Sequence, residues 1–236
     1  MYKNIFLYIF VQAAILFHED WLMAVNTYAV LIADVVESSA KTGLRALLGK
    51  KLAAASERHL REKWIKLPYS VTAGDEFQTV AGRPQWIPEL IFGLRSLFQP
   101  LSLRIGIGFG SIPGRIEAPV NQLGGEAFQR ARAAIESVKS SERFKFEVLT
   151  AFDSRNEDFD TAINLIYGLH DTLVLKIKKR QWETIEAFQR WRTLERTARQ
   201  LQLDISTVSR NLKRGHYWQM AETVKVAEAL ISRFLR

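Results

Sequence analysis

The chain has 236 residues, of which 47% are hydrophobic and 25% are charged, the balance of a globular protein with one large domain or two smaller ones. It contains no cysteine, which excludes disulfides, thiolate metal sites and cysteine nucleophiles. The formal net charge is +8. From Lys176 to Trp218 there are 11 Lys or Arg and 4 Asp or Glu, so nearly all of the positive excess lies in the last third. That distribution is expected where a segment binds a polyanion.

Residues 1–23 are expected to be an N-terminal extension. They contain an apolar run, Ile5–Phe17, which is too short to span a bilayer comfortably and precedes no small-residue cleavage site. Met23 is followed almost directly by a good strand, which favours Met23 as the natural start; a peripheral membrane anchor is the alternative. We therefore expect a cytoplasmic protein without a membrane partner.

Residues 24–152 alternate between patterns of strand and helix, and we expect one α/β domain there. The first strand, 28–36, is a continuous apolar run typical of a strand buried on both faces. The following elements are expected at 41–66 (helix), 69–73 and 77–81 (hairpin strands), 86–98 (helix), 101–110 (strand), 125–139 (helix) and 144–150 (strand). This order predicts an α+β sandwich in which helices cover one largely antiparallel sheet.

The rest of the chain is expected to be helical. Acidic residues between Asp153 and Asp160 indicate a hinge, and the segment 153–180 is expected to be a linker helix. Residues 181–236 are expected to form a separate all-α domain. The periodicity predicts helices at 159–179, 182–192, 194–202, 206–214 and 219–235.

Two acidic residues indicate a metal site. Asp34 interrupts the apolar first strand near its end, where an unpaired buried carboxylate would be costly, and Asp75 lies at the tip of the expected hairpin. If these strands are neighbours, the two carboxylates meet at one sheet edge and suit a hard cation such as Mg²⁺, with Glu37 and Glu76 as further ligands. The alternative is a pocket whose acids only make hydrogen bonds.

Several segments resemble nucleotide-forming enzymes. Ile32–Glu37 resembles the first metal-binding segment of class III nucleotidyl cyclases, and Thr72–Phe77 resembles their second and the hairpin of the GGDEF-type diguanylate cyclases. Leu103–Gly110 resembles the cyclase strand that follows. With Gly124–Phe128 and a C-terminal helix-turn-helix, the arrangement is similar to the SatD family over residues 25–235.

The resemblance implies a nucleotide-cyclase-like or GGDEF-like sandwich, the ferredoxin-like palm, followed by a helix-turn-helix domain. It implies Mg²⁺ on Asp34 and Asp75, and a nucleoside triphosphate or cyclic nucleotide as ligand. It also implies a homodimer, because class III cyclases commonly pair through this domain. The residues expected to approach the nucleotide are Val35, Val36, Glu37, Ser38, Gly74 and Glu76.

The chain departs from the cyclases at positions that matter for turnover. Val71 stands where they carry an adenine-selecting Lys, and Gln129 and Ala133 stand where they carry an Asn and an Arg that steady the transition state. Arg130 and Arg132 lie nearby and could substitute. Because phosphoryl transfer depends on positioned cations, these departures weaken the expectation of catalysis more than that of metal binding.

Three glycines in the last cyclase-like strand have two readings. Gly106, Gly108 and Gly110 could admit a ligand, or they could allow tight packing on the sheet, which is the more common reason. Their spacing and the absence of a directly following helix exclude a dinucleotide fingerprint.

The basic segment Leu194–Leu212 predicts a helix-turn-helix. Ala198 and Leu201 give the inner face of a first helix, and Val208 and Leu212 lie four apart on the second; Gln202 stands where many such turns carry Gly. The residues expected to contact double-stranded DNA are Ser206, Thr207, Ser209, Arg210, Asn211, Lys213 and Arg214. The alternative is a solvated basic bundle that docks on the first domain or forms a dimer.

The leading hypothesis is thus a SatD-type DNA-binding regulator whose cyclase-like domain senses a nucleotide or a metal. The alternative is a metal-dependent enzyme that makes a cyclic nucleotide or dinucleotide. A third is an interaction protein with neither activity.

Overall fold

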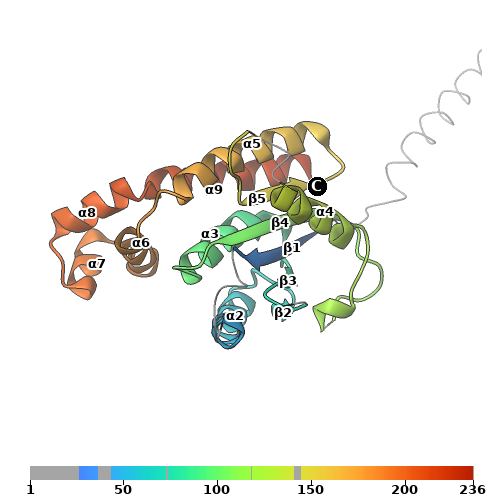
Figure 1. The fold of residues 1–236 in the computed structure, drawn as a ribbon, viewed down its shortest axis with the longest axis horizontal. Helices are drawn as coiled ribbons and strands as arrows, with labels where there is room; N and C mark the ends of the chain where they lie inside the picture. Colours follow the sequence, from blue (N-terminus) through green and yellow to red (C-terminus); the bar gives the residue numbers. More distant parts are fainter. Residues whose placement is uncertain (1–26, 37–43, 73, 118, 141–144, 236) are drawn as a thin grey trace, which may run out of the picture.

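The computed structural model describes residues 27–36, 44–72, 74–117, 119–140 and 145–235 (Figure 1). The predicted N-terminal extension and two predicted site residues, Glu37 and Ser38, lie outside these ranges. Over the ranges just given, no helix is both long enough and apolar enough to cross a membrane.

Within the described residues, five strands form one sheet in the order β2-β3-β1-β4-β5. Their bounds are β1 (Tyr28–Val35), β2 (Ser70–Val71), β3 (Phe77–Val80), β4 (Leu103–Gly110) and β5 (Thr150–Asp153). The central strand β1 is antiparallel to both β3 and β4, β2 is antiparallel to β3, and only β5 runs parallel to its neighbour β4. The predicted mixed α+β fold with a largely antiparallel sheet is therefore confirmed.

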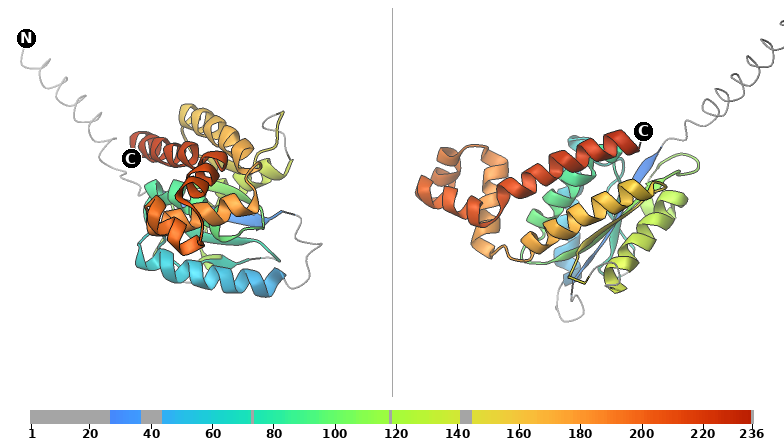
Figure 2. Two further views of the ribbon diagram at one scale, coloured as in Figure 1. Left: turned by 90° about the vertical axis from the view of Figure 1, so that its left-hand side faces the viewer. Right: turned by 90° about the horizontal axis from the view of Figure 1, so that it is seen from above.

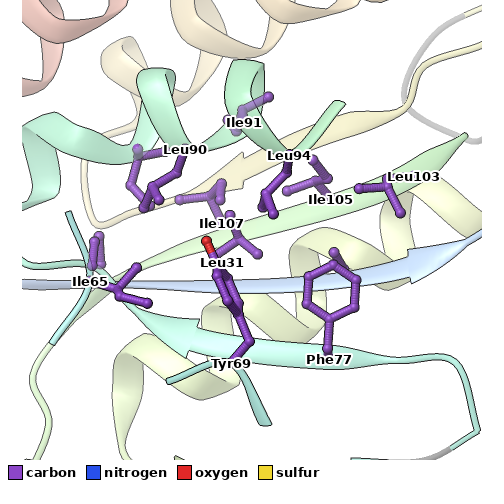
Figure 3. Close-up of a cluster of buried hydrophobic side chains, with 14 of the residues drawn as sticks. Leu31, Ile65, Tyr69, Phe77, Leu90, Ile91, Leu94, Leu103, Ile105 and Ile107 are labelled. Carbon is purple, nitrogen blue, oxygen red and sulfur yellow. The ribbon is translucent and has the colours of Figure 1, made fainter. Parts of the chain in front are cut away.

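Helices cover both faces of this sheet, which explains why β1 is apolar at nearly every position (Figure 2). The helices are α2 (Leu44–Arg61), α3 (Ile87–Leu97), α4 (Glu126–Ser140), α5 (Glu157–Val174), α6 (Lys179–Trp191), α7 (Leu194–Leu201), α8 (Ile205–Arg214) and α9 (Tyr217–Phe234), with short 3-10 turns η2 (Pro84–Trp86) and η3 (Val120–Gln122). Val30 and Ile32 of β1 pack on the side of α4. Leu31 and Ala33 point to the other side, into the larger core, where Leu94 of α3 lies above the sheet (Figure 3).

Two glycines of β4 bring α4 unusually close to the sheet. A Cβ on Gly106 would lie 2.4 Å from the backbone nitrogen of Ile135, and one on Gly108 would lie 2.1 Å from that of Ala131. Such distances leave no room for any side chain. The space in front of these glycines is therefore filled by the helix backbone, in line with the packing interpretation of the motif.

One predicted strand is wrong. The strand expected at 144–150 begins only at Thr150, the last residue of that range, and runs to Asp153. Its place is set by side chains from α5: the Asn164 side chain accepts from the backbone nitrogen of Phe152 at 2.8 Å and donates to its carbonyl oxygen at 2.9 Å. Tertiary hydrogen bonds of this kind leave no trace in the local pattern.

The acidic stretch predicted to be a hinge is instead the first turn of α5. Asn156 caps this helix, its side chain accepting from the backbone nitrogen of Phe159 at 2.9 Å, and Glu157, Asp158 and Asp160 follow in the first turn. Negative charge there is stabilised by the helix dipole. The helix ends at Val174 rather than at Lys179 as predicted.

The last helix, α9, connects the basic helical segment to the sheet layer (Figure 2). Met220 and Val224, in its first half, are buried in the cluster formed with α6, α7 and α8. Ala227 and Ile231, further along, are buried in the core that covers the sheet. Helix α9 therefore contributes buried side chains to both clusters.

Candidate acidic site and nucleic-acid interface

The structure brings Asp34 and Asp75 together at one end of β1. Asp34 is 7% exposed and lies opposite Arg104 of β4 in the register. The loop after β2 returns to the same place, because the backbone nitrogen of Val35 donates to Asp75 Oδ2 at 3.1 Å. Gly74 makes this return with a φ of 59°, a left-handed conformation that favours glycine. The predicted convergence of the two carboxylates is thus present.

Two cationic side chains of α4 pair with Asp34 and with the neighbouring Glu76. The ammonium of Lys139 lies 3.2 Å from Asp34 Oδ2. The guanidinium of Arg132 donates two hydrogen bonds, of 2.5 and 2.7 Å, to the carboxylate of Glu76. Arg104 Nη1 lies 3.9 Å from Asp34 Oδ1, too far for a hydrogen bond. The site is therefore an acid–base cluster rather than a bare acidic pocket.

The carboxylates of Asp34 and Glu76 are both buried, but their pKa values are shifted in opposite directions. Burial raises the pKa of Asp34, and the negative charge of Asp75 adds to this effect, while Lys139 and Arg104 act against it. Burial would also raise the pKa of Glu76, but the hydrogen bonds from Arg132 and Thr72 outweigh it and leave that pKa lowered. Glu76 is therefore held as the ionised partner of Arg132.

At this edge, Asp34 and Asp75 are the two carboxylates that the sequence suggested as ligands of a hard cation. In the part of the chain that the structure describes, no three His, Cys, Asp or Glu side chains converge as a metal-binding group. Asp34 Oδ1 is buried without a hydrogen-bond partner, and such an oxygen is suited to a cation. Asp34 and Asp75 could hold Mg²⁺, which usually takes one or two carboxylates and completes its shell with waters or phosphate oxygens.

The residues predicted to approach a nucleotide are only partly available. The backbone nitrogen of Val35 bonds to Asp75, and that of Val36 donates to the carbonyl oxygen of Ser102 at 2.9 Å. Glu76 is occupied by Arg132. Gly74 faces open space, since a Cβ built on it would meet nothing within 4 Å. Among the described residues of that set, Gly74 is the one that leaves most room for a phosphate.

Arg130 and Arg132 of α4, the possible substitutes for the cationic side chain of the cyclases, contact different partners. Arg132 reaches the acidic site, whereas Arg130 donates to Asp153 at 2.7 Å and to Glu126 at 3.1 Å. Glu126 also receives two hydrogen bonds from Arg155, and these are the main reason why its pKa falls to about 2. Arg130 therefore belongs to a second ionic cluster that ties α4 to the end of β5.

Lys139 and Arg104 are members of the site that the sequence pattern did not predict. Arg132 and Lys139 are seven residues apart, which places them on one side of a helix. That spacing was visible in the sequence. What was not visible is that the glycines of β4 let this side of α4 lie beside the acids.

The basic segment forms two short helices, α7 and α8, joined by a tight turn. Ala198 of α7 and Val208 and Leu212 of α8 are buried against each other and against α9, as the spacing predicted. Gln202 takes the left-handed conformation, with a φ of 53°, at the position where a glycine is common. The backbone N–H of Leu203 donates a hydrogen bond to the carbonyl oxygen of Ala198, with the two atoms 2.9 Å apart. The turn closes without a glycine.

The residues predicted to contact DNA divide into two groups. Thr207 and Asn211 are half-buried, and the Asn211 side-chain nitrogen donates to Thr184 Oγ1 of α6 at 3.1 Å. The others are exposed: Ser206, Ser209, Arg210, Lys213 and Arg214. Over the described ranges, no ion pair engages the last three of these, so their charge is uncompensated.

The comparisons with known proteins agree with the resemblance noted in the sequence. A sequence model of the SatD family matches residues 28–231, nearly the whole described chain. No curated protein matches it. The match spans the sheet, both ionic clusters and the basic helices, and on this evidence the chain belongs to the SatD family.

Proposed function

We propose that this SatD-family chain is a DNA-binding regulatory protein in which α7 and α8 form a helix-turn-helix and α8 is the recognition helix. One observation carries the proposal. Helix α8 turns Val208 and Leu212 into the core, while Arg210, Lys213 and Arg214 face solvent without acidic partners among the described residues. An exposed cationic face on the second helix of such a pair is the arrangement that reads a major groove.

The roles of the exposed residues follow from their chemistry. The Arg210 guanidinium can donate two parallel hydrogen bonds to a guanine edge, which gives sequence discrimination. Lys213 and Arg214, in the last turn, suit phosphate contacts, which give affinity without discrimination. Arg196 and Arg199 are exposed on α7 and extend the cationic surface toward the backbone of the duplex.

The α/β unit supports the regulatory half of the proposal. The strand order β2-β3-β1-β4, with α2 and α3 packed on one face, supports a ferredoxin-like palm of the kind cyclases use. At its acidic edge, Asp34 and Asp75 would hold Mg²⁺ and Gly74 would approach the phosphates of a nucleotide. When bound, the metal would neutralise phosphate charge. Ligand binding there would reach the basic helices through α9, which is buried in both cores.

A regulator is favoured over a cyclase by the state of the α4 arginines. Arg132 is held by Glu76 and Arg130 by Asp153, so neither is a free cation for a phosphoryl group in transfer. Gln129 and Ala133 replace the side chains that cyclases use for that purpose. Turnover of ATP or GTP to a cyclic product would make the enzyme the correct alternative.

The proposal is tested by the binding of the full chain to labelled duplex DNA at several salt concentrations. The wild type is expected to bind more weakly as salt rises, and Arg210→Ala together with Lys213→Ala is expected to weaken binding by about tenfold or more. Lys225→Ala together with Arg233→Ala is the matched control, because both residues are exposed cations on α9 outside the proposed interface. Equal binding by the two variants would contradict the proposed recognition helix.

A further inference from the structure

Lys139 has two sets of acidic partners. Its ammonium lies 3.2 Å from Asp34 Oδ2 and 3.9 Å from Glu76 Oε2 at the acidic edge. It also lies 3.1 Å from Glu136 Oε1, three residues back on the same helix. The Glu136 side chain is 55% exposed, so the lysine stands between a buried carboxylate and a solvated one.

A divalent cation on Asp34 would be repelled by this ammonium. Mg²⁺ binds carboxylate oxygens at about 2.0–2.1 Å, so an ion on either oxygen of Asp34 would lie within a few ångströms of the Lys139 ammonium. At such a distance, in a partly buried site, two positive charges repel strongly. The lysine therefore already supplies the charge that a metal would bring to Asp34.

The backbone that carries Lys139 has little freedom to withdraw. Helix α4 is seated on Gly106 and Gly108 with its own backbone atoms in the space of their missing side chains. A change at the site must then come from the lysine side chain, which is long and has Glu136 within reach. Glu76 already has Arg132 as a partner through two hydrogen bonds.

We propose that Lys139 is an internal counter-cation that competes with the divalent metal for Asp34, and that it keeps its existing pair with Glu136 when the metal binds. This inference rests on the proposed metal site at Asp34 and Asp75. It makes metal affinity depend on two residues that are not metal ligands. Lys139 lowers the affinity, and Glu136, which remains as the partner of the ammonium after Asp34 has bound the metal, raises it.

The test is calorimetric titration of the full chain with MgCl₂, without nucleotide. Lys139→Gln is expected to bind Mg²⁺ about two- to fivefold more tightly than the wild type, the range that loss of a partly exposed ion pair gives. Glu136→Gln is expected to bind it more weakly. Lys225→Gln is the matched control, because Lys225 makes a similar pair with Glu222 three residues away on α9 and is expected to change nothing.

The outcomes separate this inference from the proposed site. Equal Mg²⁺ affinity in wild type and Lys139→Gln, with binding abolished by Asp34→Asn, would overturn the competition and leave the metal site standing. Binding that survives Asp34→Asn, or that is absent from both wild type and Lys139→Gln, would overturn the site and the competition together. Binding seen in Lys139→Gln but undetectable in the wild type would support the competition in its strongest form.

Discussion

The side-chain amide of Asn211 donates a hydrogen bond to Thr184 Oγ1 at 3.1 Å, and this bond joins α8 to α6. Thr184 is buried, and its hydroxyl in turn donates a hydrogen bond to the carbonyl oxygen of Arg180 at 2.8 Å. Asn211, which the sequence predicted to contact DNA, therefore holds the proposed recognition helix against α6.

We predict that Asn211→Ala lowers the free energy of unfolding by about 1 kcal/mol, because it leaves the buried Thr184 hydroxyl without one partner. Urea denaturation measures the change. Arg210→Ala, on the exposed side of the same helix, is expected to leave stability nearly unchanged and to weaken DNA binding. A stable Asn211→Ala protein with lost DNA specificity would show that Asn211 turns outward to read a base.

The second prediction concerns the contact between β4 and α4. Gly108→Ala is expected to lower the free energy of unfolding by about 3 kcal/mol or more, because the new Cβ would lie 2.1 Å from the Ala131 nitrogen, a backbone atom. Gly49→Ala, within α2 with nothing in reach of its Cβ, is the control and is expected to stabilise by about 1 kcal/mol. A Gly108→Ala protein as stable as the wild type would mean that α4 does not pack as described.

The third prediction is an acid sensitivity that originates at His59. This histidine is 3% exposed, shares a 2.8 Å hydrogen bond with the Tyr69 hydroxyl, and has its pKa lowered to about 4, mainly by burial. The unfolded chain, with an ordinary histidine pKa near 6.5, binds the proton more readily between these values. The contribution of the neutral, buried His59 to the free energy of unfolding is therefore complete above pH ~6.5. It falls by up to about 1.4 kcal/mol per pH unit as the pH drops toward 4.

Denaturant unfolding between pH 7 and pH 4 measures this slope, with His59→Phe as the comparison. The variant is expected to be less stable at pH 7, where it loses the Tyr69 hydrogen bond, and to have a shallower pH dependence. The same slope in both proteins would assign the acid sensitivity to other groups.

The fourth prediction is stabilisation by a metal and nucleotide. A ligand that binds only the folded state adds about 2.7 kcal/mol when its concentration is a hundred times its Kd. Thermal unfolding with Mg²⁺ and ATP or GTP should therefore show a higher Tm in the wild type and no shift in Asp34→Asn/Asp75→Asn. A shift that persists in the double variant would place the ligand elsewhere.

Much of the fold was predictable because it depends on local patterns. The apolar run of residues 28–36 predicted a strand buried on two faces, and the Gly74-Asp75 pair predicted the hairpin tip beside it. The spacing of Ala198, Val208 and Leu212 predicted the inner faces of α7 and α8. In each case the cause is a periodicity or a turn that a short window contains.

The features that were missed depend on contacts between distant elements. The position of β5 is set by Asn164 of α5, and the inward turn of Asn211 is set by Thr184 of α6. Lys139 joins the acidic site only because β4 lets α4 lie close beside it. No local pattern around these residues encodes their partners, since the partners come from other parts of the chain.

The central claim is that a ligand at the acidic edge alters the DNA affinity of the basic helices. The most direct measurement is the Kd of the full chain for a DNA duplex, with and without Mg²⁺ and the nucleotide that raises its Tm, in the wild type and in Asp34→Asn/Asp75→Asn. The account predicts that the ligand changes the wild-type Kd by about fivefold or more, in either direction, and leaves that of the double variant unchanged. An unchanged wild-type Kd under conditions where the ligand is bound would contradict it.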